Sequence, residues 1–326
     1  MNLFPSNYLL VLSFVVLAAA CKKEDNAKPA LQNDVLKKTT GPAIVGDRVE
    51  FVYALGTTEG RLQNATADAS IAGATGTGFG RYSYYTDRNT GIDMPVLTLK
   101  DSSTKGSAST GSFVDTNAVS LRYYYVVPEE ARGKTVSFRF SGTSTTGGQT
   151  SISTRAYQMS RMDMKRSIAL ADGARCYASI ADMAAYTKDE VTTGNLSSKI
   201  DFVYIYRATM GAGNYAFGHA LVGLANTQYI TDLALPASWT KPATFLDKRI
   251  DVRDGQLKGD VNTNIYLDDT DLQRTGFTNA ANYTYGLAAD QGAFVKTSNG
   301  TVAYVYVNSI DNTRKTATVS IKRLKP

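Results

Sequence analysis

A single histidine and two cysteines limit the side-chain chemistry open to this chain of 326 residues. A catalytic triad needs a base beside a nucleophile and an acid that orients the base. His219 instead lies in the apolar segment Ala216–Val222, and the sequence has no Gly-x-Ser-x-Gly motif. We therefore expect His219 to be structural, and we predict no catalytic residue, no enzymatic activity and no cofactor. Paired carboxylates among the 29 acidic residues remain an open alternative, because acids distant in sequence can meet in the fold.

The run from Asp260 to Asp271 carries oxygen ligands at the spacing of a calcium loop. It resembles the loops of dockerin and EF-hand proteins, in which positions 1, 3, 5, 9 and 12 bind the ion; those positions hold Asp260, Asn262, Asn264, Asp268 and Asp271. Ile265 stands where the loop needs glycine, and Asp271 is shorter than the usual glutamate. We therefore predict no metal site, but a strand through Ile265 and Leu267 and a helix capped by Asp268–Asp271. Calcium binding stays open.

The 20 tyrosines offer a second kind of site, because aromatic faces stack on sugar rings. Two clusters stand out, Tyr82 with Tyr84 and Tyr85, and Tyr123–Tyr125. Tyrosine is also a favoured strand residue, and Trp239 is the only tryptophan. Most tyrosines are therefore expected to pack in sheets, while a few remain candidates for contact with carbohydrate. No ligand-binding residue is assigned on this basis.

The first 21 residues predict export and attachment to a lipid. Leu9–Leu17 is apolar and too short for a membrane span, and three alanines lead from it to Cys21. The segment Leu17–Cys21 resembles the bacterial lipobox, although Ala18 replaces the more usual leucine and no Lys or Arg precedes the apolar core. Residues 1–20 are therefore predicted to be a lipoprotein signal peptide and Cys21 the lipidation site, with the lipid bilayer as partner.

The residues after Cys21 predict where the lipoprotein resides. Lys22–Asp25 is similar to the Lys-then-two-acids signal that sends Bacteroidota lipoproteins to the outside face of the outer membrane. By this resemblance, Cys21 carries a diacylglycerol and an amide-linked chain, and the protein is lipid-anchored at the cell surface. Cys176 is then the sole free thiol, which excludes an intrachain disulfide. We expect Cys176 to be a small buried hydrophobic residue.

Charge gives no sign of nucleic acid binding. Lys and Arg number 35 against 29 Asp and Glu, a net charge of +6, and no run of five basic residues occurs. The 43% hydrophobic content is that of a globular protein and leaves room for two domains.

The chain divides into a polar segment and two β-rich regions. Residues 21–45 contain Pro29 and Pro42 with few apolar residues and are expected to be a flexible tether. From residue 46 to 157 apolar residues alternate with polar ones, as in Thr135–Phe140, and Gly, Ser and Thr clusters separate the alternating runs. This pattern predicts an antiparallel sandwich. Tyr125–Val136, where Pro128 ends a strand, resembles the late strands of an Ig-like surface domain.

The second domain is predicted over residues 158–326. Its strongest strand is Lys199–Tyr206, which is apolar on both faces and therefore central, and Thr187–Glu190 has capping-box spacing for a short helix. Here the chain resembles the C-terminal domain of uncharacterised two-domain Bacteroidota lipoproteins. That domain has a similar Lys-Ile-Asp-Phe-Val-Tyr strand, then a Trp and a Thr-Phe pair, here Trp239 and Thr244–Phe245, and a final hairpin, here Gly300–Ile321. The resemblance implies surface location and no known activity.

Together these features predict a mainly β protein, an N-terminal Ig-like β-sandwich followed by a β-rich α+β domain. The expected function is that of a non-catalytic binding protein on the outer membrane, for extracellular glycan or another surface protein. The alternative is an adhesin or pilus-like component that uses its sandwich edges for strand addition. A pilus subunit would keep a removable strand near its start and polymerise, whereas a glycan binder would stay monomeric.

Overall fold

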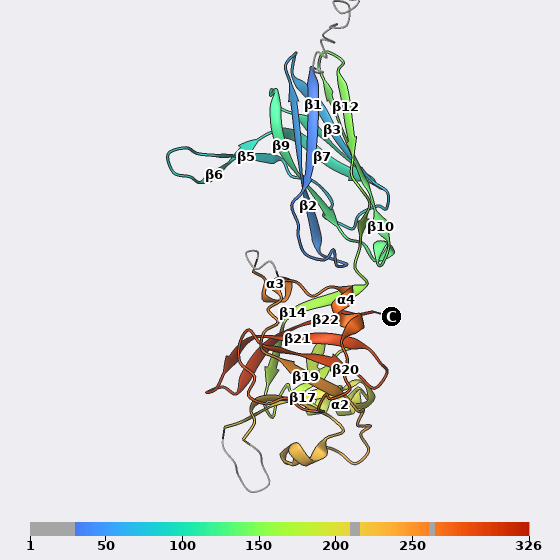
Figure 1. Ribbon diagram of the computed structural model, residues 1–326, viewed down its shortest axis with the longest axis vertical. Helices are drawn as coiled ribbons and strands as arrows, with labels where there is room; N and C mark the ends of the chain where they lie inside the picture. The colour runs from blue at the N-terminus through green and yellow to red at the C-terminus, as the bar shows by residue number, and fades with distance from the viewer. Residues whose placement is uncertain (1–29, 209–215, 261–264, 326) are drawn as a thin grey trace, which may run out of the picture.

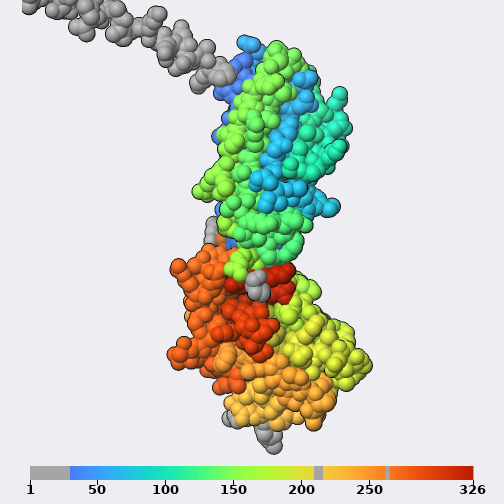
Figure 2. Space-filling model, turned by 90° about the vertical axis from the view of Figure 1, so that its right-hand side faces the viewer, coloured from blue at the N-terminus to red at the C-terminus, as the bar shows by residue number. Residues whose placement is uncertain are grey.

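The protein consists of two β-rich domains stacked end to end. The computed structural model describes residues 30–208, 216–260 and 265–325. Figures 1 and 2 show the first domain, coloured blue to green, above the second, coloured yellow-green to red. The chain crosses between them after residue 158, the end of β13, and before residue 162, the start of β14. The predicted mainly β, two-domain architecture is confirmed.

Two antiparallel sheets face each other in the first domain, in the orders β1-β2-β9-β4 and β12-β11-β3-β8-β7. Their strands are β1 (Leu31–Lys37), β2 (Arg48–Thr57), β3 (Leu62–Ala69), β4 (Gly78–Phe79), β7 (Leu99–Lys105), β8 (Ala108–Phe113), β9 (Ala118–Val126), β11 (Phe138–Ser144) and β12 (Gln149–Ser153). Smaller elements are β5 (Tyr82–Thr86) with β6 (Asp93–Leu97), β10 (Thr135–Val136) with β13 (Tyr157–Gln158), and the 3-10 helix η1 (Glu129–Ala131). The predicted sandwich is present; its Ig-like assignment stays a prediction.

Aromatic rings from both sheets fill the core of the first domain. Phe51 of one sheet packs on Phe138 of the other, with ring centroids 4.6 Å apart, and Tyr123 meets Phe140 edge to face at 5.4 Å. All four side chains are at most 1% exposed. The period-two alternation in the sequence therefore marks the inward face of these strands.

The predicted flexible tether over residues 21–45 is wrong in its second half. Residues 31–37 form β1, which pairs in register with β2 along its whole length. Leu31 is 3% exposed and Val35 packs against the same core, whereas Leu36 points to solvent. An edge strand needs few apolar residues because only one face of it meets the core. A segment this polar therefore carries a weak strand signal.

The second domain also consists of two antiparallel sheets, in the orders β14-β22-β21-β20-β19 and β16-β15-β17-β18. Their strands are β14 (Met162–Ala171), β15 (Tyr177–Ser179), β16 (Ala184–Tyr186), β17 (Phe202–Arg207), β18 (Gly218–Gly223), β19 (Phe245–Arg249), β20 (Gly292–Lys296), β21 (Val302–Asp311) and β22 (Thr316–Leu324). The helices are α2 (Lys188–Thr193), α3 (Gly255–Lys258), α4 (Asp269–Arg274) and the 3-10 turns η2 (Ser197–Lys199), η3 (Thr227–Tyr229) and η4 (Thr231–Leu233).

Three local predictions for the second domain are confirmed. The predicted central strand is β17, although it begins at Phe202 and Lys199 belongs to η2; it lies between β15 and β18, and Phe202, Val203 and Ile205 are completely buried. Helix α2 begins with the capping box, in which Thr187 and Glu190 satisfy each other's backbone N–H groups. Strands β21 and β22 close the domain as a hairpin. Among the described residues no helix is long and apolar enough to cross a membrane.

The two domains share a small apolar cluster and a hydrogen-bonded junction. Ile44 of the first domain is completely buried, in a cluster with Met162, Leu257 and Leu272 of the second. At the junction, the Arg132 guanidinium of the first domain donates to the Met162 carbonyl of the second over 3.0 Å. These contacts hold the two domains together close to the segment where the chain passes from one to the other.

A buried ion pair lies beneath α3. Lys322 of β22 and Asp254 have fully buried side chains, and Lys322 Nζ donates to Asp254 Oδ2 over 2.6 Å. Nζ also donates to the Gln256 side chain at 2.8 Å and to the Leu267 carbonyl at 3.1 Å, so all three N–H bonds of the ammonium group have acceptors. Burial lowers the pKa of Lys322, and Asp254 opposes that shift.

Removing the cation of this pair will destabilise the protein more than removing both charges. Lys322→Met leaves the Asp254 carboxylate buried without a counter-ion, and we expect a loss of about 3–5 kcal/mol in the free energy of unfolding. Adding Asp254→Asn should recover part of the loss, because the amide oxygen can still cap α3. Urea unfolding measures both, with the exposed Lys165→Met as control. A loss below about 1 kcal/mol for Lys322→Met would refute this role for the ion pair.

A second buried carboxyl makes stability depend on pH. Asp201 is 6% exposed and accepts a hydrogen bond from the Ile180 backbone N–H at 2.7 Å. Burial raises the pKa of Asp201 to about 6 from 3.8, and the nearby Asp182 adds to the shift. The stability contributed by the protonated group is therefore complete below about pH 4 and is lost as the pH rises through about 6.

We expect Asp201→Asn to stabilise the protein at neutral pH only. The amide keeps an acceptor for Ile180 but has no charge to bury, so the free energy of unfolding should rise by about 2–3 kcal/mol at about pH 7.5 and hardly at all at about pH 3.5. Denaturant unfolding at the two pH values, with Asp101→Asn on the exposed part of β7 as control, checks this. An equal effect at both pH values would contradict it.

Candidate functional site

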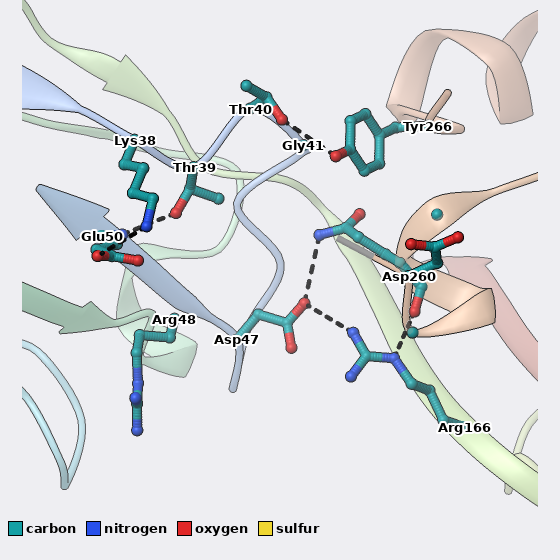
Figure 3. Close-up of a pocket in the computed structure, with 13 residues that line it drawn as sticks. Lys38, Thr39, Thr40, Gly41, Asp47, Arg48, Glu50, Arg166, Asp260 and Tyr266 are labelled. Carbon is teal, nitrogen blue, oxygen red and sulfur yellow. Dashed lines mark hydrogen bonds and ion pairs between the residues drawn. The ribbon is translucent and has the colours of Figure 1, made fainter. Parts of the chain in front are cut away.

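A cavity of about 650 Å³ lies between the two domains. The first domain lines it with the segment from Lys38 to Gly41 and the start of β2, and the second with Arg166, α3 and Tyr266 (Figure 3). The two sets of residues lie more than a hundred positions apart in the sequence. The site therefore exists only because the domains pack as they do.

Gln256 of α3 forms the floor of the cavity. Its Nε2 donates to the Pro42 carbonyl at 3.0 Å and to Asp47 Oδ2 at 3.4 Å, both in the first domain. Its Oε1 accepts from the buried Lys322. The ion pair of Lys322 with Asp254 thus fixes the orientation of the side chain that connects the two domains.

Acidic and basic side chains alternate on the walls. Arg166 of β14 approaches Asp47 at 3.9 Å, and Lys38 approaches Glu50 at 3.7 Å, as the dashed lines in Figure 3 indicate. The guanidinium group of Arg48 lies 4.6 Å from the centre of the Tyr124 ring, a cation–π contact. Burial raises the pKa of Asp47, although Arg166 and Lys322 act against the shift.

Tyr266 is the one aromatic side chain among the lining residues. Its hydroxyl is 3.1 Å from Thr40 Oγ1, and a Cβ at Gly41 would come within 3.1 Å of its ring. Glycine at position 41 therefore lets the ring lie against the backbone of the first domain. The ring is partly exposed, so one part of it is available to a ligand.

The chemistry of this lining is that of hydrogen bonding combined with ring stacking. Three acidic residues, Asp47, Glu50 and Asp260, are balanced by Lys38, Arg48 and Arg166. Donors and acceptors on opposite walls suit a ligand with many hydroxyl groups, and the tyrosine face suits its apolar C–H surface.

His219 does not belong to this site. The side chain is 4% exposed, with Nδ1 2.6 Å from the Tyr204 hydroxyl and Nε2 2.7 Å from Asn312 Oδ1. Its ring also packs on Tyr206, with centroids 4.5 Å apart. Both nitrogens have partners in the fold, which agrees with the structural role predicted for this residue.

In the Asp260–Asp271 run, the described acidic side chains mainly stabilise local structure. Asp268 caps α4 by accepting from the backbone N–H groups of Thr270 and Asp271, so the predicted helix cap is confirmed. The predicted strand through Ile265 and Leu267 is wrong, because the Leu267 N–H donates to Asp254 Oδ2 instead of to a neighbouring strand. Residues 261–264 lie outside the described residues. In the part of the chain that is described, no three His, Cys, Asp or Glu residues could together hold a metal ion.

The two tyrosine clusters have opposite environments. Tyr123 and Tyr125 are completely buried, and Tyr124 between them is half-buried on the opposite face of β9, whereas Tyr82, Tyr84 and Tyr85 on β5 are about half exposed. Alternation could not distinguish the clusters, since both lie on strands.

Of the two cysteines, Cys176 is buried and free as predicted, and burial raises its pKa to about 12. Cys21 lies outside the described residues.

Sequence reasoning missed the cavity itself. Its lining combines the end of the segment predicted to be a tether, the start of the predicted sandwich, and polar residues and glycines of the second domain that are far apart in the sequence. Tyr266 is the one lining residue whose type could indicate a binding site, but it lies within the predicted strand through Ile265 and Leu267.

Comparison with known proteins identifies the family. Residues 28–159 match a domain of unknown function, DUF4466, and residues 160–326 match a second one, DUF8576. A crystal structure of a DUF4466 family protein from Parabacteroides merdae is 35% identical with a TM-score of 0.82, covering 91% of this chain and 99% of that chain. No curated protein matches the chain.

Two other solved structures are much less similar. The major pilin subunit BcpA of Bacillus cereus is 8% identical with a TM-score of 0.28, covering 88% of this chain and 63% of its own. The sporulation control protein Spo0M of Bacillus subtilis is 11% identical with a TM-score of 0.23, covering 40% of this chain and 48% of its own. The match to the Parabacteroides protein confirms the predicted resemblance to an uncharacterised two-domain protein of Bacteroidota. This chain belongs to the DUF4466 family, with a DUF4466 domain followed by a DUF8576 domain.

Proposed function

We propose that this protein is a non-catalytic carbohydrate-binding protein of the bacterial surface, and that the cavity between its domains is the binding site. The observation that carries the proposal is the lining of that cavity, in which paired acids and bases surround one partly exposed tyrosine. Each sugar hydroxyl both donates and accepts hydrogen bonds, so it needs both kinds of group nearby. The cavity volume of about 650 Å³ is in the range of small-molecule sites.

The balance of charge favours a neutral glycan over a polyanion. The three acidic and three basic lining residues sum to zero, and Asp47 and Glu50 would repel a sulfated or uronic chain. Glu50 also forms an ion pair with Arg122 at 3.1 Å, so the carboxylate is held in place before a ligand arrives. A preorganised polar wall lowers the entropy cost of binding.

Tyr266 provides the sharpest test of the site. On a microarray of neutral oligosaccharides, the mature chain with Cys21→Ser should bind at least one glycan. Tyr266→Ala should weaken that binding about tenfold or more, because it removes the stacking surface, whereas Tyr266→Phe should retain most of it. Calorimetric titration with the glycan found on the array would measure both affinities.

Tyr285→Ala is the matched control, because Tyr285 is 62% exposed and does not line the cavity. Thermal unfolding of each variant should show that the fold is retained. Silence of the wild-type chain across the array, or equal affinity in Tyr266→Ala, would refute the proposal.

The surface location is proposed from the start of the sequence. The apolar core Leu9–Leu17, the alanines and Cys21 support a lipid anchor, and Lys22–Asp25 supports export to the outer face of the outer membrane. Two or more acyl chains hold a protein firmly on a bilayer, whereas one alone is marginal. The lipid bilayer is therefore the proposed partner at this end of the chain.

Cys21→Ser should abolish both lipid labelling and membrane association. In cells fed an alkyne fatty acid, the wild-type protein should carry the label and sediment with the outer membrane, and the variant should do neither. Cys176→Ala is the control, since the Cys176 thiol is buried and should not matter for labelling. A Cys21→Ser protein that still sediments with the membrane would contradict the anchor.

A further inference from the structure

The outward face of the sheet β1-β2-β9-β4 connects the cavity to the β5–β6 hairpin, which extends sideways next to β9 in Figure 1. Glu50 of β2 lines the cavity and forms an ion pair with Arg122 of β9 at 3.1 Å. Arg122 in turn lies over the ring of Tyr84 on β5, with its guanidinium carbon 5.9 Å from the ring centre. The wall of the cavity therefore reaches the hairpin through direct side-chain contacts.

These side chains share one face because side chains alternate along a strand. In the register of β2 with β9, Glu50 lies opposite Tyr124, and Val52 lies opposite Arg122. The residues that alternate with them, such as Phe51, are buried in the core of the sandwich. From Glu50 to Val52 the strand advances about 7 Å. The surface in front of Tyr84 therefore lies next to the cavity on the same side of the domain.

Tyr84 offers the same kind of surface on this face as Tyr266 offers in the cavity. The Arg122 guanidinium lies over one side of the Tyr84 ring, and the residue is 47% exposed. A cation over an aromatic face attracts the ring, so Arg122 helps to hold Tyr84 in position. The exposed part of the ring is left free to stack on the apolar C–H surface of a sugar.

Tyr124 lies between the cavity and Tyr84. Burial raises the pKa of Tyr124, and its neighbours Glu50 and Tyr84 raise it further. The Arg48 guanidinium lies 4.6 Å from the centre of the Tyr124 ring, and a Cβ at Gly80 would come within 3.3 Å of that ring. Glycine at position 80 therefore lets the ring lie against the backbone that leads into β5. The face between the two sites is thus occupied by a half-buried ring and ion-paired side chains.

We propose that Tyr84 forms a second sugar subsite, and that the ligand of the cavity is a neutral oligosaccharide long enough to reach from Tyr266 to Tyr84. This inference rests on the proposed function, because it extends the same binding site. The surface between the two tyrosines repeats the chemistry of the cavity, since Glu50 and Arg122 offer an acceptor and donors to sugar hydroxyl groups. A ligand of one sugar would contact Tyr266 alone.

The polar groups on this face favour a glycan over an apolar protein surface. The side chains of Glu50 and Arg122 are 24% and 19% exposed, so both reach solvent. An apolar partner would remove water from this ion pair without replacing the lost hydrogen bonds, which costs free energy. A sugar chain supplies hydroxyl groups to both side chains while its C–H surface covers the ring of Tyr84.

The affinity of the protein should therefore rise with the length of the oligosaccharide. The probes are the malto-, cello-, manno- and xylo-oligosaccharide series and any further neutral glycan that binds on the array, each prepared from disaccharide to octasaccharide. Calorimetric titration into the mature chain with Cys21→Ser measures each affinity. In a series that binds, the long oligomers should bind about tenfold more tightly than the shortest ligand detected, because they stack on a second ring.

Tyr84→Ala should remove this gain and leave the affinity for the shortest ligands unchanged, whereas Tyr84→Phe should keep the gain. Unchanged binding of the short ligands also shows that the Tyr84→Ala protein is folded. Tyr85→Ala is the matched control, because Tyr85 is 53% exposed but points to the other face of the hairpin. Tyr266→Ala should weaken the binding of ligands of every length.

The outcomes distinguish a failure of this inference from a failure of the proposed function. Silence of the wild-type chain toward every glycan would refute both. Short ligands that bind through Tyr266 without any gain in affinity with length would refute the second subsite alone, and so would a Tyr84→Ala protein that binds long oligomers as tightly as wild type. A Tyr84→Ala protein that loses short and long ligands equally would also refute it, because Tyr84 would then not act as a separate subsite.

Discussion

The buried ion pair between Lys322 and Asp254 is the interaction on which the site depends. Asp254 accepts from Lys322 and from two backbone N–H groups, those of Leu257 in α3 and Leu267 in the following segment. One carboxylate therefore caps a helix, fixes the chain on the far side of that helix and neutralises a buried ammonium group. Replacing the Asp254 carboxylate by an apolar group would leave these buried N–H donors without an acceptor.

The same ion pair also fixes a contact between the two domains. Because Lys322 also holds the side-chain oxygen of Gln256, the amide nitrogen of Gln256 points to the first domain, where it meets Pro42 and Asp47. Ile44, buried against the second domain, prevents the adjacent loop from moving away from this contact. The cavity is therefore bounded by groups that are positioned by a hydrophobic core and an ion pair rather than by solvent-exposed loops alone, which is the arrangement that favours binding without rearrangement.

Much of the fold could be predicted from local sequence signals, but the site could not. Period-two alternation marks the sandwich strands, Lys199–Tyr206 marks the central strand of the second domain, and Thr187 marks the start of α2. These signals are local because each element is specified by residues within a few positions of one another. The walls of the cavity meet only through domain packing, and β1 escaped prediction because an edge strand needs few apolar residues.

The tyrosines illustrate why residue type alone could not locate a binding surface. In the core, the buried Tyr204 and Tyr306 hydroxyls find partners in His219 and Asp290, so burial of the ring costs no unsatisfied polar group. On β5, a strand of similar composition leaves the main sheets, and its tyrosines remain half exposed. The deciding factor is whether the face of the strand that carries the tyrosine packs against a second sheet. That factor is a property of the topology, and it separates tyrosines that stabilise this fold from tyrosines that are available to a partner.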